Sequence, residues 1–322
     1  MYWYRPGRVR SLFGISLQSL MLRLFFPHGH SLLQLLLVLR IFPGSLPSEL
    51  RFLSNLNVLW LTGTVMKGSI PFNLGLLSNC QTFILEDGNL SGTIPTELGL
   101  LGSSLSSSSS SLREFQITGQ QNLTGSIPSE LALLLPSLTR FALQSNHLSG
   151  SLPLELFTST IGARKNSPIP TPESLLQSFT IHSNQLTGSL PSEIGYWTSL
   201  TELFIHENHL EGRLPTELGS LTKLRDGRFH NNNFSGPLPS ELGHATELQQ
   251  LLLRNNPLTG TIPREWERLT NLRFMDVAGT DISGDVEFMC TIWPSFWITT
   301  DCEGETRRKL ACSCCQCDWG QI

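Results

Sequence analysis

The strongest constraint on the fold of this 322-residue chain is a repeat between Leu200 and Pro263. Four residue types recur there at a step of 24: Gly212, Gly236 and Gly260; Pro215, Pro239 and Pro263; Leu200, Leu224 and Leu248; Asn208, Asn232 and Asn256. A fixed period of this length indicates one supersecondary unit stacked on copies of itself, because a single unit cannot bury its apolar side chains alone. The sequence therefore predicts a repeat solenoid.

The same register can be followed from residue 32 to residue 284, over ten units. These start at Leu32, Leu56, Cys80, Leu112, Leu138, Leu176, Leu200, Leu224, Leu248 and Leu272. Two insertions interrupt it: a serine-rich stretch at 102–111 and a segment that contains Pro168, Pro170 and Pro172. Both fall between the end of one unit and the start of the next, where loops are tolerated, and we expect solvated loops.

Each unit reads L-x-x-L-x-L-x-x-N-x-L-x-G-x-I/L-P-x-E-L-G. Leucines at positions four and six alternate with exposed residues, which predicts a strand with one buried face. Asn at position nine can satisfy backbone groups of adjacent coils, and Gly and Pro enforce a turn into a short 3₁₀ segment. Gly227 stands at position four of its unit, so we expect loose packing near Phe229.

The motif L-x-x-L-x-L-x-x-N-x-L-x-G-x-I-P resembles the 24-residue, plant-type leucine-rich repeat. It is similar to the repeats of plant receptor-kinase ectodomains and of polygalacturonase-inhibiting proteins. The resemblance implies an α/β repeat solenoid: a right-handed superhelix with a parallel concave β-sheet and short 3₁₀ or irregular convex segments. It also implies recognition of a protein, peptide or glycan on the concave strands.

Two functions are compatible with this resemblance. The first is a receptor-like or signalling recognition module without a kinase domain, since the chain contains no kinase motif set. The alternative is a secreted inhibitor of a hydrolase such as a polygalacturonase. An enzyme is not predicted, because the array contains no nucleophile–base pair, phosphate loop or metal-spaced cluster outside the tail, and no cofactor is expected.

The candidate ligand contacts are exposed strand positions of the units from Leu176 onward: His182, Glu202, Phe204, His206, Asp226, Arg228, His230 and Arg254. Stacked parallel strands bring equivalent side chains to about 4.8 Å, so the three histidines should form a column. This column is either a set of ordinary solvated strand residues, a pH-sensitive binding strip or a metal site. Because ligands in a straight column line up rather than converge, no metal is predicted. If the strip binds a partner, its affinity should change between about pH 5 and 7.

Charge restricts the partners further. The formal net charge is −4, with no basic footprint for nucleic acid. The expected partner is a protein, peptide or glycan. Membrane attachment is not evident in the sequence. The sequence does not determine the oligomeric state.

The tail at 285–322 reads as a cysteine-rich cap over the last coil, which would otherwise expose its core. It holds Cys290, Cys302, Cys312, Cys314, Cys315 and Cys317. An even number of cysteines is consistent with disulfides, in any of fifteen pairings. Zinc is disfavoured because the tail has no histidine and its C-S-C-C-Q-C stretch lacks the paired C-x-x-C knuckles that zinc modules use. Disulfides would imply an oxidising compartment. The D-C…C-x-C-C pattern also resembles the tails of leucine-rich repeat proteins of diatoms.

The segment 1–31 is either a signal-like region or a degenerate first coil, since its apolar stretch is interrupted by Gln18 and Arg23. Three sequons start at Asn89, Asn122 and Asn233. They are glycan acceptors if the chain is secreted, although N-x-L-S/T-G is itself part of the repeat. The expected location is extracellular or at the cell surface.

Overall fold

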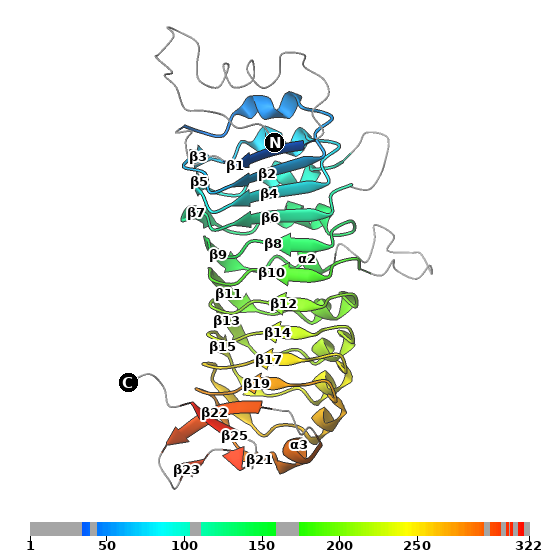
Figure 1. Ribbon diagram of the computed structural model, residues 1–322, viewed down its shortest axis with the longest axis vertical. Helices are drawn as coiled ribbons and strands as arrows, with labels where there is room; N and C mark the ends of the chain where they lie inside the picture. The colour runs from blue at the N-terminus through cyan, green and yellow to red at the C-terminus, as the bar shows by residue number, and fades with distance from the viewer. Residues whose placement is uncertain are drawn as a thin grey trace.

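The computed structural model describes residues 34–38, 44–103, 111–158, 174–292, 297–303, 307–308, 310–311 and 315–318. The N-terminal segment 1–31, most of the serine-rich stretch and the Pro-rich insertion lie outside these residues. The described chain is a ladder of stacked coils (Figure 1). The predicted fold class, a leucine-rich repeat solenoid built on a parallel sheet with short 3₁₀ helices, is confirmed.

The main sheet takes one strand from each of the ten units, and every neighbouring pair among them is parallel. Its strands are β1 (Gln34–Val38), β2 (Val58–Thr62), β4 (Thr82–Glu86), β6 (Glu114–Thr118), β8 (Arg140–Ala142), β10 (Ser178–Thr180), β12 (Glu202–Phe204), β14 (Asp226–Arg228), β17 (Gln250–Leu252) and β19 (Phe274–Asp276). The register follows the repeat, so that Glu202 pairs with Asp226 and Phe204 with Arg228. Equivalent positions of successive units therefore lie side by side across the sheet.

The return segments of the units are helical. They are η1 (Ser48–Phe52), η2 (Phe72–Leu76), η3 (Thr96–Leu100), η4 (Ser129–Leu134), η6 (Ser192–Tyr196), η7 (Thr216–Ser220), η8 (Ser240–His244), η9 (Arg264–Arg268) and the short α-helix α2 (Glu155–Thr158). The repeat proline precedes every one of these 3₁₀ helices, as Pro215 does with φ −68° before η7. Proline fixes this angle and has no N–H to leave unpaired at a helix start, which explains its place in the motif.

A second layer of strands was not predicted from the sequence. The L-x-G part of the motif forms β3 (Lys67–Ser69), β5 (Asn89–Gly92), β7 (Asn122–Gly125), β9 (His147–Ser151), β11 (Gln185–Ser189), β13 (His209–Gly212) and β15 (Asn233–Phe234), and then β16 (Gly236–Pro237), β18 (Leu258–Gly260) and β20 (Asp281–Ile282). The motif glycine has a left-handed backbone, with φ +83° at Gly212. A side chain is strained in that conformation, which accounts for glycine at this position.

After Gly284 the repeat ends and the chain forms β21 (Gly284–Asp285), α3 (Glu287–Ile292), β22 (Trp297–Glu303), β23 (Arg307–Arg308), β24 (Leu310–Ala311) and β25 (Cys315–Asp318). Strand β22 pairs in parallel with β19 and so extends the main sheet. The last repeat strand is thus covered at its edge by backbone from the tail, which leaves it no open edge for pairing with another chain.

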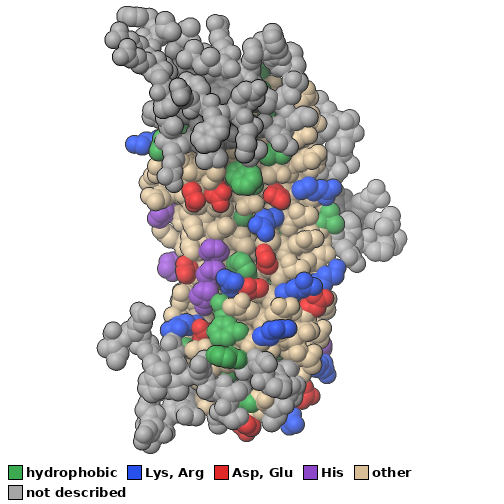
Figure 2. Space-filling view, viewed as in Figure 1, with side chains coloured by type: hydrophobic (Ala, Val, Ile, Leu, Met, Phe, Trp, Pro, Cys, Tyr) green, Lys and Arg blue, Asp and Glu red, His purple; other side chains and the backbone are tan. Residues whose placement is uncertain are grey.

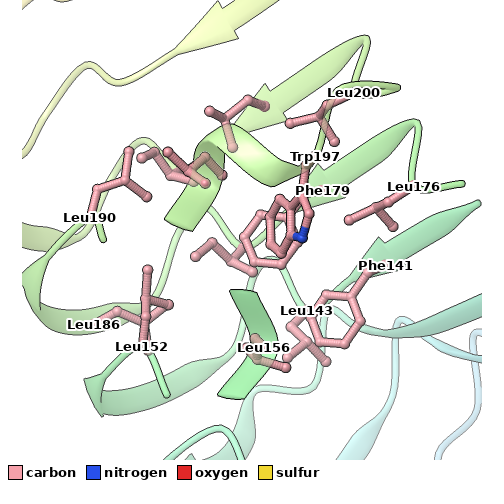
Figure 3. Packing of buried hydrophobic residues seen from close by; sticks show 14 of the residues in the cluster. Phe141, Leu143, Leu152, Leu156, Leu176, Phe179, Leu186, Leu190, Trp197 and Leu200 are labelled. Carbon is pink, nitrogen blue, oxygen red and sulfur yellow. The ribbon is translucent and has the colours of Figure 1, made fainter. Parts of the chain in front are cut away.

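Aromatic side chains form the spine of the core in the first half of the array. Phe83, Phe115, Phe141 and Phe179 occupy position four of successive units and stack with centroid separations of 5.6, 5.7 and 5.3 Å. Figure 3 shows where this spine meets the ring of Trp197, 4.7 Å from Phe179. All of these rings are fully buried.

The expectation of loose packing beside Gly227 is wrong. A Cβ atom at Gly227 would lie 3.0 Å from Cε2 of Phe229 and 3.4 Å from Cδ1 of Leu251. Phe229, at position six of the same unit, is fully buried and fills the volume that a leucine at position four would take. The two positions have exchanged volume, which cores tolerate when the total is kept.

The asparagine at position nine joins neighbouring coils. Asn208 donates through Nδ2 to the carbonyl oxygens of Ile205 and His206 in its own unit and of Ile181 in the unit before. Its Oδ1 accepts from the N–H of Leu186. Asn184, Asn232 and Asn256 make equivalent contacts, including the acceptor bond from the preceding coil. The predicted role of this residue is confirmed.

Candidate functional site

The candidate site is the outward surface of strands β10, β12, β14, β17 and β19, together with the residues that directly follow each strand; we call it the strand face. Figure 2 looks onto this face and shows histidine, arginine, acidic and apolar side chains gathered around and below the middle of the view. All eight predicted contact residues lie here. The repeat register is the reason, because it places positions three, five and seven of each unit on the same side of the sheet.

The three predicted histidines form a stacked column. The rings of His182 and His206 have centroids 4.2 Å apart at 11° from parallel, and those of His206 and His230 are 4.2 Å apart at 17°. His206, in the middle, is only 8% exposed. The Nδ1 atoms of His206 and His230 are buried and have no hydrogen-bond partner among the described residues.

Burial is the main reason why the pKa values of these rings are low. The pKa of His206 is lowered to about 3, first by loss of solvation and then by the neighbouring His182, His230 and Arg228. Desolvation also lowers the pKa of His182 and of His230, while the carboxylate of Glu207 partly offsets it. The three imidazoles are therefore neutral at pH 7. The predicted window of about pH 5 to 7 is too high for His206, because the burial of this side chain cannot be read from the repeat pattern.

This difference predicts a pH effect on stability. The unfolded chain takes up a proton at His206 near pH 6.5, whereas the folded chain does so only near pH 3. Acidification between these values hence favours the unfolded state, and the contribution to the free energy of unfolding is complete only above pH 6.5. Between pH 7.5 and 4.5, we expect the free energy of unfolding to fall by about 2–3 kcal/mol more in wild type than in His206→Gln. The buffer contains EDTA so that no metal ion contributes to this difference.

Denaturant titrations at the two pH values measure this loss. Glutamine is a fitting replacement because Gln144 occupies the same position two units earlier. His147→Gln, at an exposed histidine on β9, is the control and should keep the wild-type pH dependence. Equal pH dependence of wild type and His206→Gln would contradict the low pKa.

Phe204 and Arg228 form the second part of the strand face. The guanidinium of Arg228 lies over the ring of Phe204, 4.3 Å from its centroid. The same group donates to both carboxylate oxygens of Asp226, at 3.1 and 2.7 Å. These bonds raise the pKa of Arg228 and fix a planar cation beside an aromatic ring. Aromatic residues and arginine are both enriched in protein interfaces.

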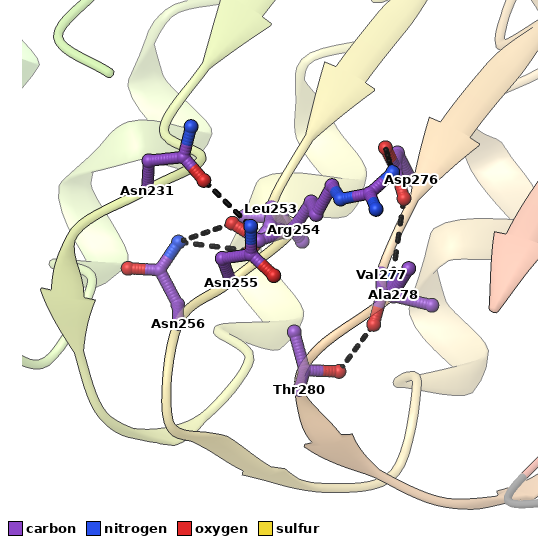
Figure 4. A network of polar contacts seen from close by, with 9 residues as sticks. All are labelled: Asn231, Leu253, Arg254, Asn255, Asn256, Asp276, Val277, Ala278 and Thr280. Atoms are coloured by element: carbon purple, nitrogen blue, oxygen red, sulfur yellow. Dashed lines mark hydrogen bonds and ion pairs between the residues drawn. The ribbon is translucent and has the colours of Figure 1, made fainter. Parts of the chain in front are cut away.

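Arg254 continues the face toward the tail (Figure 4). It lies 4.0 Å from the carboxylate of Asp276. Beside it, Asn255 donates to Oδ1 of Asn231 at 2.7 Å. At the other end, Glu202 accepts a hydrogen bond of 2.8 Å from Ser178. The polar groups of the face are thus mutually oriented before any partner binds.

Several residues of this face were not predicted from the sequence. Phe274 of β19 pairs in register with Trp297, which comes from the tail and is 57% exposed. Trp297 lies outside the repeat, so the repeat register could not predict its place on this face. Asp276, by contrast, is position five of the last unit, and extending the register by one unit would have included it.

Glu207, which follows His206, was missed as well. Its backbone is left-handed, with φ +55°. Other units carry Gly63, Asp87, Gly119, Ser145, Ser183, Asn231, Asn255 or Gly279 at this position, all with positive φ. A glutamate at this position departs from the pattern, and this departure could have identified Glu207 as a candidate site residue from the sequence.

The predicted glycan acceptors begin strands of the second layer: Asn89 on β5, Asn122 on β7 and Asn233 on β15. Asn122 and Asn233 are exposed and Asn89 is half-buried. Of the predicted disulfide cysteines, Cys290 lies on α3, Cys302 on β22, and Cys315 and Cys317 on β25. Cys312 and Cys314 lie outside the described residues.

Comparisons with known proteins agree with the repeat. A model of the leucine-rich repeat matches residues 199–221 and 247–269. A search of curated proteins gave no match. The repeat structure is that of a plant-type leucine-rich repeat protein.

Solved structures of plant receptors are similar over most of the chain. A TDR receptor structure matches with 28% identity and a TM-score of 0.71, over 84% of this chain and 42% of its own. The Arabidopsis receptor kinase HAESA, in complex with the peptide hormone IDA and the co-receptor SERK1, matches with 26% identity and a TM-score of 0.66, over 84% and 47%.

The plant peptide hormone receptor RGFR1, in complex with RGF2, matches with 27% identity and a TM-score of 0.63, over 80% and 42%. The chain spans less than half the length of each of these three structures. Within the described parts of the chain, no helix has the length and apolar character needed to cross a bilayer.

Proposed function

We propose that this chain is a non-catalytic recognition module that binds a peptide or protein segment on the strand face. The observation that carries the proposal is the arrangement of Phe204 and Arg228. An aromatic ring under a guanidinium that Asp226 already holds loses little conformational entropy on binding, so its contacts contribute to affinity. The similar receptors RGFR1 and HAESA, which are in complex with RGF2 and IDA, support a peptide as the ligand class.

The shape of the face supports an extended ligand. Polar and aromatic side chains follow one another across five parallel strands, which at about 4.8 Å per strand is a path of roughly 20 Å. An extended chain of about six residues has this length. The ligand would lie across the strands and contact one repeat unit after another.

The test is selection of peptides on the purified protein. A displayed library of random peptides should yield a family with a shared motif, and these peptides should fail to bind Phe204→Ala/Arg228→Ala. Enrichment that is the same on both proteins would contradict the proposal. Inhibition of a polygalacturonase by the purified protein, with no peptide enriched, would favour the hydrolase-inhibitor alternative instead.

We propose an extracellular or cell-surface location for this module. Cys290 is disulfide-bonded, disulfides persist in oxidising compartments, and Asn122 and Asn233 are exposed sequons. The similar structures are named as receptors, one of them in complex with RGF2 and another with the peptide hormone IDA, which supports the same location. Intact mass of the protein secreted from a eukaryotic host, before and after reduction, measures glycans and disulfides; an unglycosylated chain with all thiols free would contradict it.

A further inference from the structure

A cluster of potential metal donors lies on the strand face between β12 and β14. One ring nitrogen each from His206 and His230 and one carboxylate oxygen of Glu207 all lie within 4.8 Å of one another. The histidine column alone does not converge on a metal ion. Glu207 changes that geometry, because its left-handed backbone directs the glutamate at a different angle from the strand residues before it.

We propose that His206, Glu207 and His230 form a binding site for a divalent transition-metal ion of the zinc class, with further coordination positions open on the strand face. Two imidazoles and one carboxylate are donors that zinc accepts, and three protein ligands with an open position are typical of accessible zinc sites. Calcium and magnesium prefer oxygen donors and do not fit this set.

The unpartnered histidine nitrogens are the second observation. Among the described residues, no hydrogen bond involves the ring of His206 or of His230, and the Nδ1 atoms of both are buried. His206 is more than nine-tenths buried. Buried polar atoms normally have partners, so two orphaned nitrogens in adjacent rings indicate a missing one. Both rings are neutral at pH 7, which is the form that binds metal ions.

The carboxylate of Glu207 is held by the neighbouring unit. Its Oε2 accepts a hydrogen bond of 2.6 Å from Oγ of Ser183, and the same Oγ lies 3.1 Å from Nδ1 of His182. Metal ligands are commonly oriented by such outer hydrogen bonds. Ser183 is therefore a positioning residue for this site.

The strain at Glu207 points the same way. Asparagine and glycine tolerate a left-handed backbone, whereas glutamate does not favour it. Glutamate nevertheless occupies position eight beside the two orphaned histidines, whereas Asn231 and Asn255 occupy the equivalent positions in the next two units.

Two features of the site oppose metal binding: the neighbouring arginine cations and the stacking of the two histidine rings. The cations of Arg228 and Arg254 are close enough to affect His230, but Asp226 and Asp276 lie against them. The two rings are also stacked, so their nitrogen lone pairs run side by side. Ligand atoms around zinc lie roughly 3–3.5 Å apart, so binding requires one ring, most simply the half-buried His230, to turn toward the carboxylate.

The experiment is calorimetric titration of ZnCl₂ into the full chain after EDTA treatment and dialysis. We expect one zinc ion to bind at this site. His206→Gln and Glu207→Asn should each weaken it by about 100-fold or more, and Ser183→Ala by about 10-fold. His147→Gln should bind as wild type does. The same affinity in His206→Gln, Glu207→Asn and wild type would overturn the proposal, as would the absence of zinc binding in wild type.

Two further measurements distinguish zinc binding at this site from an effect of misfolding and from zinc binding by the cysteines of the tail. Glu207→Asn relieves the backbone strain, so without metal its melting temperature should equal or exceed that of wild type while zinc no longer raises it. Co²⁺ bound at the proposed site should lack a sulfur-to-cobalt charge-transfer band, because its ligands are nitrogen and oxygen. A strong band of that kind, unchanged in His206→Gln, would place the ion on cysteines and contradict the proposal.

Discussion

Replacing Phe179 with alanine is expected to lower the free energy of unfolding by about 3–5 kcal/mol, the range for deleting a buried phenylalanine ring. Phe179 joins two parts of the core, because its ring contacts Phe141, Phe157 and Trp197, with centroids 5.3, 6.3 and 4.7 Å away. Alanine would remove these contacts and leave a cavity between two adjacent coils. In a solenoid each unit is stabilised mainly by its neighbours, so a cavity at one junction weakens the whole array.

Denaturant unfolding followed by circular dichroism measures this loss. The matched control is Phe204→Ala, since Phe204 belongs to the next unit but lies on the strand face, where it contacts Arg228. We expect a loss of about 1–2 kcal/mol there, because Phe204 is only half-buried and its removal costs a cation–π contact but leaves no cavity in the core. Similar losses in the two variants would show that the aromatic spine is not the core element inferred above.

Replacing Asn208 with alanine is expected to cost about 2–4 kcal/mol. The substitution leaves the buried N–H of Leu186 unpaired. It also removes one of two donors from the carbonyl oxygens of Ile181 and Ile205, which keep their bonds from Asn184 and Asn232. The unpaired N–H costs about 1–3 kcal/mol, and the lost bonds to the two carbonyl oxygens add about 0.5–1 kcal/mol each. Asn208→Asp should also destabilise, because aspartate keeps the shape and the acceptor but loses the donors.

Asn271→Ala is the control for this effect. Asn271 also donates through Nδ2 to a carbonyl oxygen of the preceding coil, that of Thr246 at 2.8 Å, but it is exposed. Water can replace that bond, so we expect a loss of roughly 0.5–1 kcal/mol. The comparison is made by the same denaturant titration. If Asn208→Ala were as stable as Asn271→Ala, the asparagine ladder would not be what joins the coils.

The repeat period predicted the parts of this protein that depend on register alone. Asn208 and Pro215 have the roles that the spacing assigned to them, because the repeat fixes their neighbours in space as well as in sequence. The column of His182, His206 and His230 was predicted for the same reason. Periodicity determines which side chains are adjacent.

Periodicity does not determine burial, orientation or compensation between positions. The depth of His206, and so its low pKa, depends on the side chains packed around it. The volume exchange between Gly227 and Phe229 was invisible when each position was compared with the consensus separately. The second strand layer was missed because the glycine and proline of its L-x-G-x-I/L-P segment indicate a turn. The segment becomes a strand only through pairing with the same segment of the next coil, as Thr187 pairs with His209.

The dissociation constant of a selected peptide, measured by calorimetry, tests the central claim that the strand face is the binding surface. Phe204→Ala/Arg228→Ala should weaken binding by about 30-fold or more, since aromatic and arginine hot spots contribute about 2 kcal/mol or more. Phe72→Ala/Arg264→Ala removes the same residue types from exposed positions on η2 and η9 and should leave the constant within about threefold of wild type. Unchanged affinity in the strand-face variant, with weakened affinity in the helix-side variant, would contradict the account.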